Sequence, residues 1–268
     1  MLWVALFFIG LFVGAFGTLI GAAGGFILVP VLLFLYPGET PATITSITLT
    51  VAFFNALSGS IAYGRLRRID YRSGLLFALA SVPGAIIGAS ITASLSRGIF
   101  QTIFAVTLLL VAAYLAIRPE RKSTAVATTG HTVRRIVDRY GNEFSYSYKR
   151  IRGIAIAFFI GLMSGLLGIG GGIIHVPALT QVLGFPTHVA TATSHFVVSM
   201  TTLAAVTTHA VSGAFTEGIR RAAVLSAGAV IGAQFGARLS HRVSGVLIVR
   251  LLAIGLATVA IRLLVAPL

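Results

Sequence analysis

The sequence predicts an all-α membrane protein with about eight transmembrane helices, arranged as two internally repeated four-span units. Each unit is expected to open with a glycine-broken helix. Of the 268 residues, 57% are hydrophobic and 10% are charged, whereas a soluble domain carries roughly 25% charged residues. Apolar segments long enough to cross a bilayer follow one another along the chain. Glycine-rich and threonine-rich motifs recur in the same order in both halves.

Eight apolar segments are long enough to cross a hydrocarbon core of roughly 30 Å. We expect them at 2–36, 42–63, 73–95, 98–117, 153–183, 188–211, 220–238 and 244–265. The first segment of each half is too long for one plain span and contains a glycine cluster. Because glycine loses more conformational freedom than any other residue when a helix forms, we expect both segments to be broken helices.

A polar segment divides the chain into three parts. We expect a first repeat unit over 1–117, a basic cytoplasmic linker over 118–152 and a second repeat unit over 153–268. The linker contains nine Lys or Arg residues and three acidic residues. We expect part of it to form a short surface helix.

The basic residues predict the orientation in a cell membrane, because short cytoplasmic loops carry an excess of Lys and Arg. The loops expected inside are 64–72, 118–152 and 212–221. The turns expected outside, which contain no Lys or Arg, are 37–41 and 184–188. This pattern places both termini in the cytoplasm. Arg238 and Arg242, beside an outside turn, do not fit it.

The net charge of +14 would indicate a nucleic-acid partner in a soluble protein, but here the positive-inside rule explains it. A lipid bilayer is therefore the expected environment, and no nucleic acid is expected as a partner. The lack of cysteine excludes disulfides, thiolate metal sites and cysteine nucleophiles. No cofactor or metal is expected, and the sequence leaves a homo-oligomer open.

Three pairs of matching stretches define the internal repeat. They are GAAGGFILVP at 21–30 with GIGGGIIHVP at 168–177, ATITS at 42–46 with ATATS at 190–194, and GAIIGA at 84–89 with GAVIGA at 228–233. Four spans per unit would leave the two units parallel. If each broken segment instead folds back as a hairpin, the repeats would be inverted.

The paired motifs resemble the TauE/SafE family of membrane permeases. The resemblance rests on Gly-x-x-Gly-Gly-x-x-x-x-Pro in the first half, Gly-x-Gly-Gly-Gly-x-x-x-x-Pro in the second, and an Ala-Thr-x-Thr-Ser run after each. It covers nearly the whole chain except the linker, with Ala23 where the second motif has Gly170. It implies export or uptake of sulfite, sulfonates or related small anions.

The glycine clusters supply the first candidate site. A broken helix leaves up to four unpaired amides at the start of its second half, and these amides together with the helix dipole attract an anion. We therefore expect Gly24, Gly25, Gly171 and Gly172 to bind substrate through main-chain amides. The alternative is that these glycines only allow close helix packing.

Polar side chains in the apolar segments supply further candidates. The hydroxyls of Thr45, Ser46, Thr193 and Ser194 can cap helices or donate to an anion. Asn55 is an uncharged polar residue that should face the bundle interior.

Histidines are the ionisable candidates at membrane depth. His175 and His195 could carry a proton or bind an anion when charged. The alternative is a neutral histidine bonded to a carbonyl or hydroxyl. His209, near a span end, is a weaker candidate. All six acids fall in loops or at span ends, which disfavours a metal-cation pathway and favours an anionic or neutral substrate.

These observations together predict a secondary transporter for a small oxyanion such as sulfite, a sulfonate or a related sulfur-containing acid. The anion would be held at broken-helix N-termini near mid-membrane. A passive anion channel with the same architecture is the first alternative. An intramembrane enzyme with three histidine metal ligands is the second, and it is disfavoured because the sequence lacks His-Glu-x-x-His and a nearby carboxylate base. The protein is therefore not expected to be an enzyme.

Overall fold

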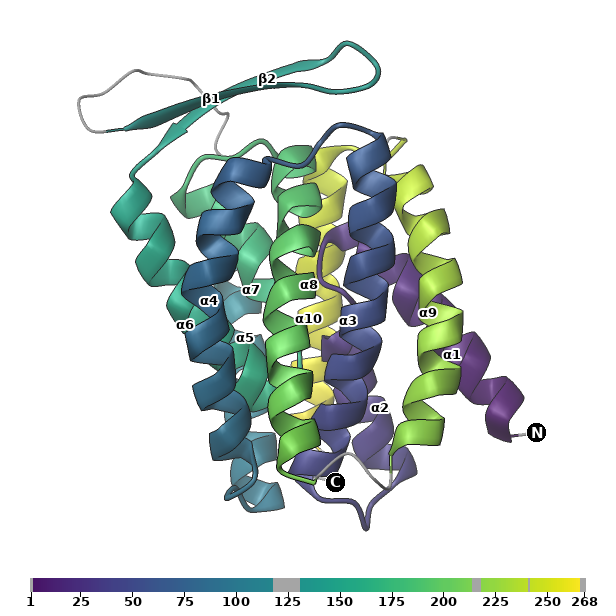
Figure 1. Cartoon of the computed structure of the whole chain (residues 1–268). Coiled ribbons are helices and arrows are strands. Elements are labelled where there is room, and N and C mark those ends of the chain that lie inside the picture. Colours follow the sequence, from purple (N-terminus) through teal and green to yellow (C-terminus); the bar gives the residue numbers. More distant parts are fainter. Residues whose placement is uncertain (1, 118–130, 214–217, 241, 266–268) are drawn as a thin grey trace.

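The computed structural model describes residues 2–117, 131–213, 218–240 and 242–265 and is mostly helical (Figure 1). The helices before the linker are α1 (Leu2–Ile20), α2 (Gly25–Leu35), α3 (Pro41–Arg65), α4 (Tyr71–Thr92) and α5 (Arg97–Ile117). Those after it are α6 (Arg150–Leu167), α7 (Gly172–Pro177), the π-helix η1 (Ala178–Val182), α8 (Thr187–Val211), α9 (Ile219–Leu239) and α10 (Gly245–Val265). Residues 118–130 of the linker lie outside the described part.

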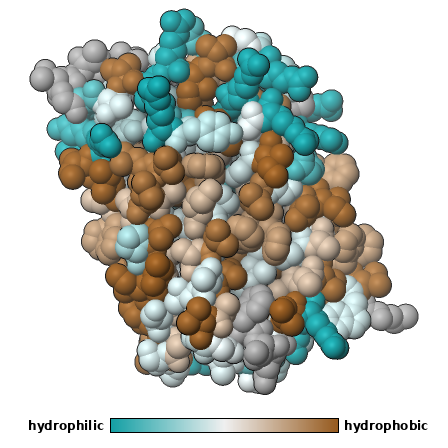
Figure 2. Space-filling model, in the orientation of Figure 1, coloured by the Kyte–Doolittle hydropathy of each residue, from teal (hydrophilic) through white to brown (hydrophobic). Residues whose placement is uncertain are grey.

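The chain is a multi-pass membrane protein. Within the described residues, seven helices are long and apolar enough to cross a membrane, namely α1, α3, α4, α5, α6, α8 and α9. The shorter apolar stretches are α2, the joined α7–η1 segment and 246–261 of α10. Figure 2 shows apolar side chains over the middle of the bundle and hydrophilic ones gathered at one end. The count of eight spans and the division into two repeats stay predictions.

Each opening segment reverses direction at its glycines. The first leaves α1 at Ile20 and begins α2 at Gly25, and α2 leads back toward the side from which α1 came (Figure 1). In the second, α6 starts beside the linker strands (Figure 1). Its return limb, α7–η1, leads to Phe185, whose ring packs on Tyr146 and Tyr148 of the linker. The two reversals therefore open toward opposite ends of the bundle.

The central helices of the two halves also run in opposite directions. Thr45, near the start of α3, lies 3.4 Å from the Nε2 of His209, near the end of α8. Gly59, near the end of α3, touches the ring of His195, near the start of α8. Matching helices therefore point opposite ways, which favours the inverted arrangement of the repeat.

The opening helix of each half packs on a helix of the other half. A Cβ on Gly232 of α9 would lie 2.1 Å from the carbonyl oxygen of Leu11 in α1. Likewise, a Cβ on Gly88 of α4 would lie 2.1 Å from the carbonyl oxygen of Leu162 in α6. Small residues allow this close backbone approach. The GAIIGA and GAVIGA stretches therefore serve to interlock the two halves.

The chain is mostly helical rather than all-α, and the described part of the linker before α6, residues 131–149, contains no surface helix, contrary to the expectation. The linker forms an antiparallel hairpin of β1 (Thr132–Val137) and β2 (Glu143–Tyr148). Its strands are rich in β-branched and aromatic residues, which favour extended structure. The turn between them contains Gly141 at φ 84°, a conformation that glycine adopts without strain.

The expected sidedness is wrong, relative to the linker, for the 184–188 turn, for the loop between α8 and α9, and for the start of α1 and the end of α10. The 184–188 turn lies at the hairpin end, whereas the 37–41 turn, the start of α1 and the end of α10 lie toward the other end (Figure 1). The expectation assumed that each opening segment crosses the membrane once. Because α6 and α7–η1 fold back, each loop after them changes side relative to the linker, and because α1 and α2 fold back, the start of α1 lies on the same side as the 37–41 turn. Arg238 and Arg242 then lie at the hairpin end with the other arginines, and Arg220 and Arg221 lie opposite.

We predict that Gly232→Ala destabilises the fold, because the added methyl group would clash with the main chain of α1. Overpacking of this kind costs roughly 1–3 kcal/mol, and a lower melting temperature in detergent would reveal it. Gly98→Ala is the matched control, since nothing lies within 4 Å of the added Cβ. Equal melting temperatures for the two variants would contradict the packing role.

Candidate functional site

Two glycine turns interrupt the helical runs in the bundle interior. Gly24 precedes α2 at φ 77° and Gly171 precedes α7 at φ 76°. Both residues are buried, and their positive φ is a conformation that side chains other than glycine disfavour. These two candidates therefore have a conformational reason to be glycine.

The two turns touch each other through their main chains. A Cβ on Gly25 would lie 2.7 Å from the carbonyl oxygen of Ile169, and one on Gly172 would lie 2.4 Å from that of Gly21. The contacts are reciprocal, because each turn places the first residue of its half-helix against the other turn. Any side chain at either position would force the turns apart.

We call the contact between the two turns, 21–25 and 168–172, the glycine junction. The starts of α2 and α7 present main-chain amides to it. No side chain caps either helix. Among the described residues, no hydrogen-bond acceptor is found for the amides of Gly25, Phe26, Gly172 and Ile173. Amides left unpaired at a helix start, together with the helix dipole, favour negative charge. The junction therefore has the chemistry of an anion site.

His195 and Asn55 bring unsatisfied side-chain atoms to the centre of the bundle. Both residues are fully buried. Asn55 accepts a 2.7 Å hydrogen bond from Thr18 of α1, but its Nδ2 has no partner. His195 bonds the carbonyl oxygen of Thr191 through Nδ1, and its Nε2 has no partner. A Cβ added to Gly59 of α3 would lie 3.3 Å from Thr18 and 2.5 Å from the ring of His195, so these two side chains lie close together.

The four candidate hydroxyls have different surroundings. Ser194 donates to the carbonyl oxygen of Gly21 at 3.2 Å and so lies at the glycine junction. Thr45 donates to the carbonyl oxygen of Pro41, one turn earlier. Ser46 also bonds a carbonyl of its own helix. Thr193 accepts from the amide of Asp70, away from the junction.

The other two histidines lie apart from His195. His175 is buried with its Nδ1 unpartnered and meets the ring of Phe77 at 6.2 Å between centroids. His209 lies beside Thr45 at the far end of α8. In the part of the chain that the structure covers, no three His, Cys, Asp or Glu side chains gather as a metal site would require.

Sequence reasoning missed three polar residues near the junction. Thr18 positions Asn55, and the hydroxyls of Thr191 and Ser164 are buried without a partner. Thr191 belongs to the ATATS run, which was a usable signal. Thr18 and Ser164 each precede a glycine cluster by less than two helical turns, but only the fold shows that they face inward.

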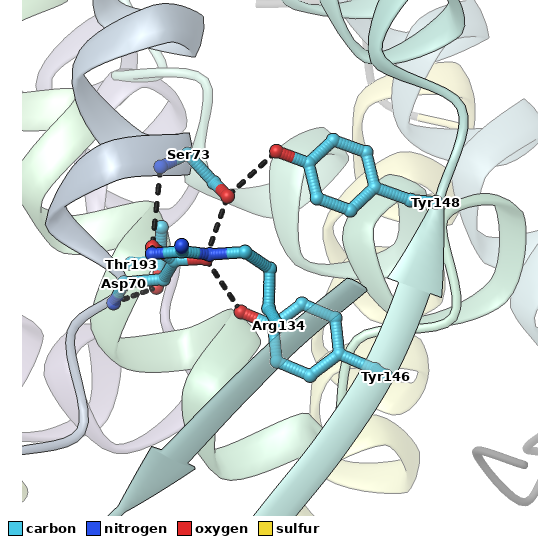
Figure 3. Close-up of polar contacts among 6 residues, drawn as sticks. All are labelled: Asp70, Ser73, Arg134, Tyr146, Tyr148 and Thr193. Carbon is cyan, nitrogen blue, oxygen red and sulfur yellow. Dashed lines mark hydrogen bonds and ion pairs between the residues drawn. The ribbon is translucent and has the colours of Figure 1, made fainter. Parts of the chain in front are cut away.

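A polar cluster anchors the hairpin to the bundle. Asp70 caps the start of α4 and accepts hydrogen bonds from Arg134 of β1 at 2.6 and 2.9 Å. It also accepts from Tyr146 of β2 at 2.7 Å. Ser73 bonds both Asp70 and Tyr148 at 2.6 Å, as Figure 3 shows. The carboxylate therefore joins both strands to the membrane helices.

Burial alone would raise the pKa of Asp70, but hydrogen bonds from Arg134, Ser73 and Tyr146 outweigh it and lower the pKa to about 2. An unfolded aspartate has a pKa of about 3.9. The pair therefore contributes its full stability above that value and loses it as the pH falls toward 2. Hairpin docking should not change near neutral pH.

We predict that Asp70→Asn loosens the hairpin, because Arg134 loses its charged partner. Hydrogen bonds to charged groups contribute roughly 2 kcal/mol, or about a 30-fold change in local opening, which hydrogen exchange of the β1 and β2 amides would measure. Glu143→Gln is the control, since its pair with Arg135 is exposed and contributes little. Equal exchange in both variants would contradict the anchoring role.

Known proteins place the chain in a family. A family model described as sulfite exporter TauE/SafE matches residues 6–263. The chain is 33% identical to the probable membrane transporter protein YunE of Bacillus subtilis over 270 residues, 98% of each chain. It is 24% identical to the probable membrane transporter protein ORF9 of Sinorhizobium sp over 264 residues, 98% of this chain and 93% of that one. No solved structure matches it. With its apolar helices and paired glycine turns, the chain belongs to the TauE/SafE sulfite exporter family of membrane transporters.

Proposed function

We propose that the protein is a secondary transporter for a small oxyanion such as sulfite, a sulfonate or a related sulfur-containing acid. The observation that carries the proposal is the junction of two helix starts with unpaired amides at Gly25, Phe26, Gly172 and Ile173. Helix starts of this kind point at anionic substrates in transporters with discontinuous helices. The description of the matching family, a sulfite exporter, agrees with an anionic substrate.

The proposed architecture is eight spans in two inverted repeats, each opening with a glycine-broken helix. Opposite directions of α3 and α8 support it, as do the two glycine reversals that open toward opposite ends. Inverted repeats give a transporter two related conformations, one open to each side. Ser194, Asn55, His175 and His195 would assist the amides, whereas Thr45, Ser46 and Thr193 would mainly support the helices.

We place the hairpin end in the cytoplasm and both termini on the outer side of the cell membrane. Basic residues gather at the hairpin end (Figure 1), as the positive-inside rule requires. They are Arg65, Arg67, Arg68, Arg72, Arg134, Arg135, Arg139, Lys149, Arg150, Arg152, Arg238 and Arg242. The opposite end has Arg97, Arg220, Arg221 and, near the end of α10, Arg262.

The two segments that fold back, α2 and α7–η1, are each held at a different end of the bundle, which suits alternating access. At the outer end, Arg221 of α9 pairs with Glu39 at 2.6 Å, and its guanidinium lies 3.9 Å from the ring centre of Tyr36, just after α2. Arg97 of α5 also donates to the carbonyl oxygen of Leu33 at 2.7 Å. At the hairpin end, the ring of Phe185 packs on Tyr146 and Tyr148. Release of one end at a time would open the junction to one side.

The direct test is flux in liposomes. Purified protein should transport sulfite or a small sulfonate with saturable kinetics, because the anion must occupy the junction before the protein changes conformation. Isotope or ion-chromatography measurement of trapped anion would quantify it against empty liposomes. Single-channel currents would instead indicate a passive anion channel, and no anion flux under any gradient would refute the transport proposal.

Opening of the hairpin end can be tested because the chain has no native cysteine. Tyr146→Cys with Phe185→Cys, whose ring centroids lie 4.3 Å apart in the native protein, should allow a short bifunctional maleimide to hold the hairpin on the 184–188 turn. We predict that cross-linking slows flux about tenfold or more, because it blocks a required conformational step.

The matched control is Val133→Cys with Ser147→Cys, which pair across the hairpin strands. Cross-linking there leaves the hairpin free to leave the bundle and should preserve flux. Full flux in the cross-linked Tyr146 and Phe185 variant would show that the hairpin stays docked throughout transport.

A further inference from the structure

The imidazole of His195 is held in one tautomer. Its Nδ1 lies 3.1 Å from the carbonyl oxygen of Thr191, one turn earlier in α8. A carbonyl oxygen can only accept, so Nδ1 carries the hydrogen. In the neutral ring Nε2 is then a bare lone pair that can accept a hydrogen bond or a proton.

That lone pair faces the polar centre of the bundle and has no partner. The Nε2 of His195 lies 3.1 Å from where a Cβ on Gly59 would be, and it is buried without a hydrogen bond. Asn55 lies one helical turn before Gly59, on the same face of α3. Its Nδ2 is a buried donor that also lacks a partner. The centre therefore offers one vacant acceptor beside one vacant donor.

No charged side chain satisfies or protonates this imidazole within the described part of the chain. From α3 the titratable neighbour is Tyr63, whose ring meets that of His195 edge-on at 5.4 Å. The Tyr63 hydroxyl donates instead to the carbonyl oxygen of Thr18 in α1. Asp70, at the start of α4, directs its carboxylate to Arg134. The membrane helices that the structure describes contain no Asp or Glu.

We propose that the site takes the singly protonated form of a weak-acid oxyanion, with the acidic O–H of the substrate donated to Nε2 of His195. This inference rests on the proposed function and specifies its substrate as a singly protonated oxyanion, such as hydrogensulfite. A deprotonated oxyanion presents only acceptors and would leave the lone pair of Nε2 facing negative charge. A singly protonated oxyanion supplies the missing donor. Its remaining oxygens would accept hydrogen bonds from Asn55 and the main-chain amides.

The proton balance is simple. The O–H···N hydrogen bond and its O⁻···H–N⁺ form differ only in the position of one proton between substrate oxygen and Nε2. The proton returns to the substrate oxygen when the anion leaves. Each transport event therefore moves one anion and one proton together, and no other acid or base of the protein is required.

The sign of the internal pH change tests this proposal. A singly protonated oxyanion releases protons after it enters a liposome buffered near pH 7.5, so its influx acidifies the interior. A fully deprotonated anion takes up protons instead, so its influx makes the interior more alkaline. We predict that sulfite influx through the wild-type protein acidifies a trapped pH dye beyond the change in empty liposomes. Methanesulfonate, which has no such proton, should be transported at least about tenfold more slowly because Nε2 would be left without a donor.

The test variant is His195→Gln, and His209→Gln is its matched control because His209 lies beside Thr45 at the end of α8. His195→Gln should lose the preference for sulfite over methanesulfonate and the acidification, and His209→Gln should keep both. Because His195→Gln could fail to fold, ¹⁵N spectra of histidine-labelled wild-type protein provide a second readout. The Nε2 resonance should show a bare nitrogen that moves when sulfite is added.

The outcomes separate the two proposals. Absence of any anion flux in wild-type protein would refute the transporter itself. Flux that makes the interior alkaline, equal rates for sulfite and methanesulfonate, or an Nε2 resonance unaffected by sulfite would refute only the role of His195.

Discussion

The structure depends on the contact between two glycine turns at the centre of the bundle. Each turn places the first residue of its half-helix against a carbonyl group of the other turn. A Cβ added to Gly25 would lie 2.7 Å from the carbonyl oxygen of Ile169, and one added to Gly172 would lie 2.4 Å from that of Gly21. This contact requires both helical runs to stop at the same place. It also requires the two halves to interlock, which the packing of α1 on α9 and of α6 on α4 achieves. The proposed anion site follows from the same constraint, because amides at a helix start have no internal acceptor.

The polar residues of the membrane helices divide into two classes. Most hydroxyls bond a carbonyl one turn earlier in their own helix, as Thr45, Thr50 and Thr202 do, and this satisfies them within an apolar environment. A smaller class, including Asn55 and His195, retains a buried atom without a partner. An unsatisfied buried polar group costs roughly 1–3 kcal/mol. A ligand that supplies the missing partner to Asn55 and His195 would offset this cost.

Hydropathy predicted most helix positions well, because about 20 apolar residues are needed to cross a bilayer whatever the fold. The α3 and α8 helices, for example, begin and end within two residues of the expected 42–63 and 188–211. The helices α1 and α6 end at the glycine clusters, where the positive φ of glycine is a local property; that each cluster breaks one transmembrane helix stays a prediction. Asn55 and His195 could be selected because a polar group at membrane depth is rare.

Other features depend on contacts between distant segments and could not be predicted. The side of the 184–188 turn and of the following loops was predicted wrongly because hydropathy does not distinguish a segment that crosses from one that returns. Thr193 accepts from the amide of Asp70, 123 residues away in sequence, a contact that no local pattern indicates. Thr18 was missed because its role appears only when α1 packs against α3. The hairpin was missed because its anchoring to Asp70 involves residues from three separate segments.

The central claim, that main-chain amides of the glycine junction bind the anion, can be tested by replacing one amide with an ester. Phenyllactic acid in place of Phe26 removes only the N–H and keeps the side chain. The same replacement with the hydroxy-acid analogue of Leu28, whose amide already bonds the carbonyl of Gly24, is the control. Loss of a hydrogen bond to a charged group should weaken equilibrium binding of sulfite roughly tenfold to a hundredfold at Phe26 and leave it nearly unchanged at Leu28. Equal affinity in the Phe26 ester and the unmodified protein would contradict the account.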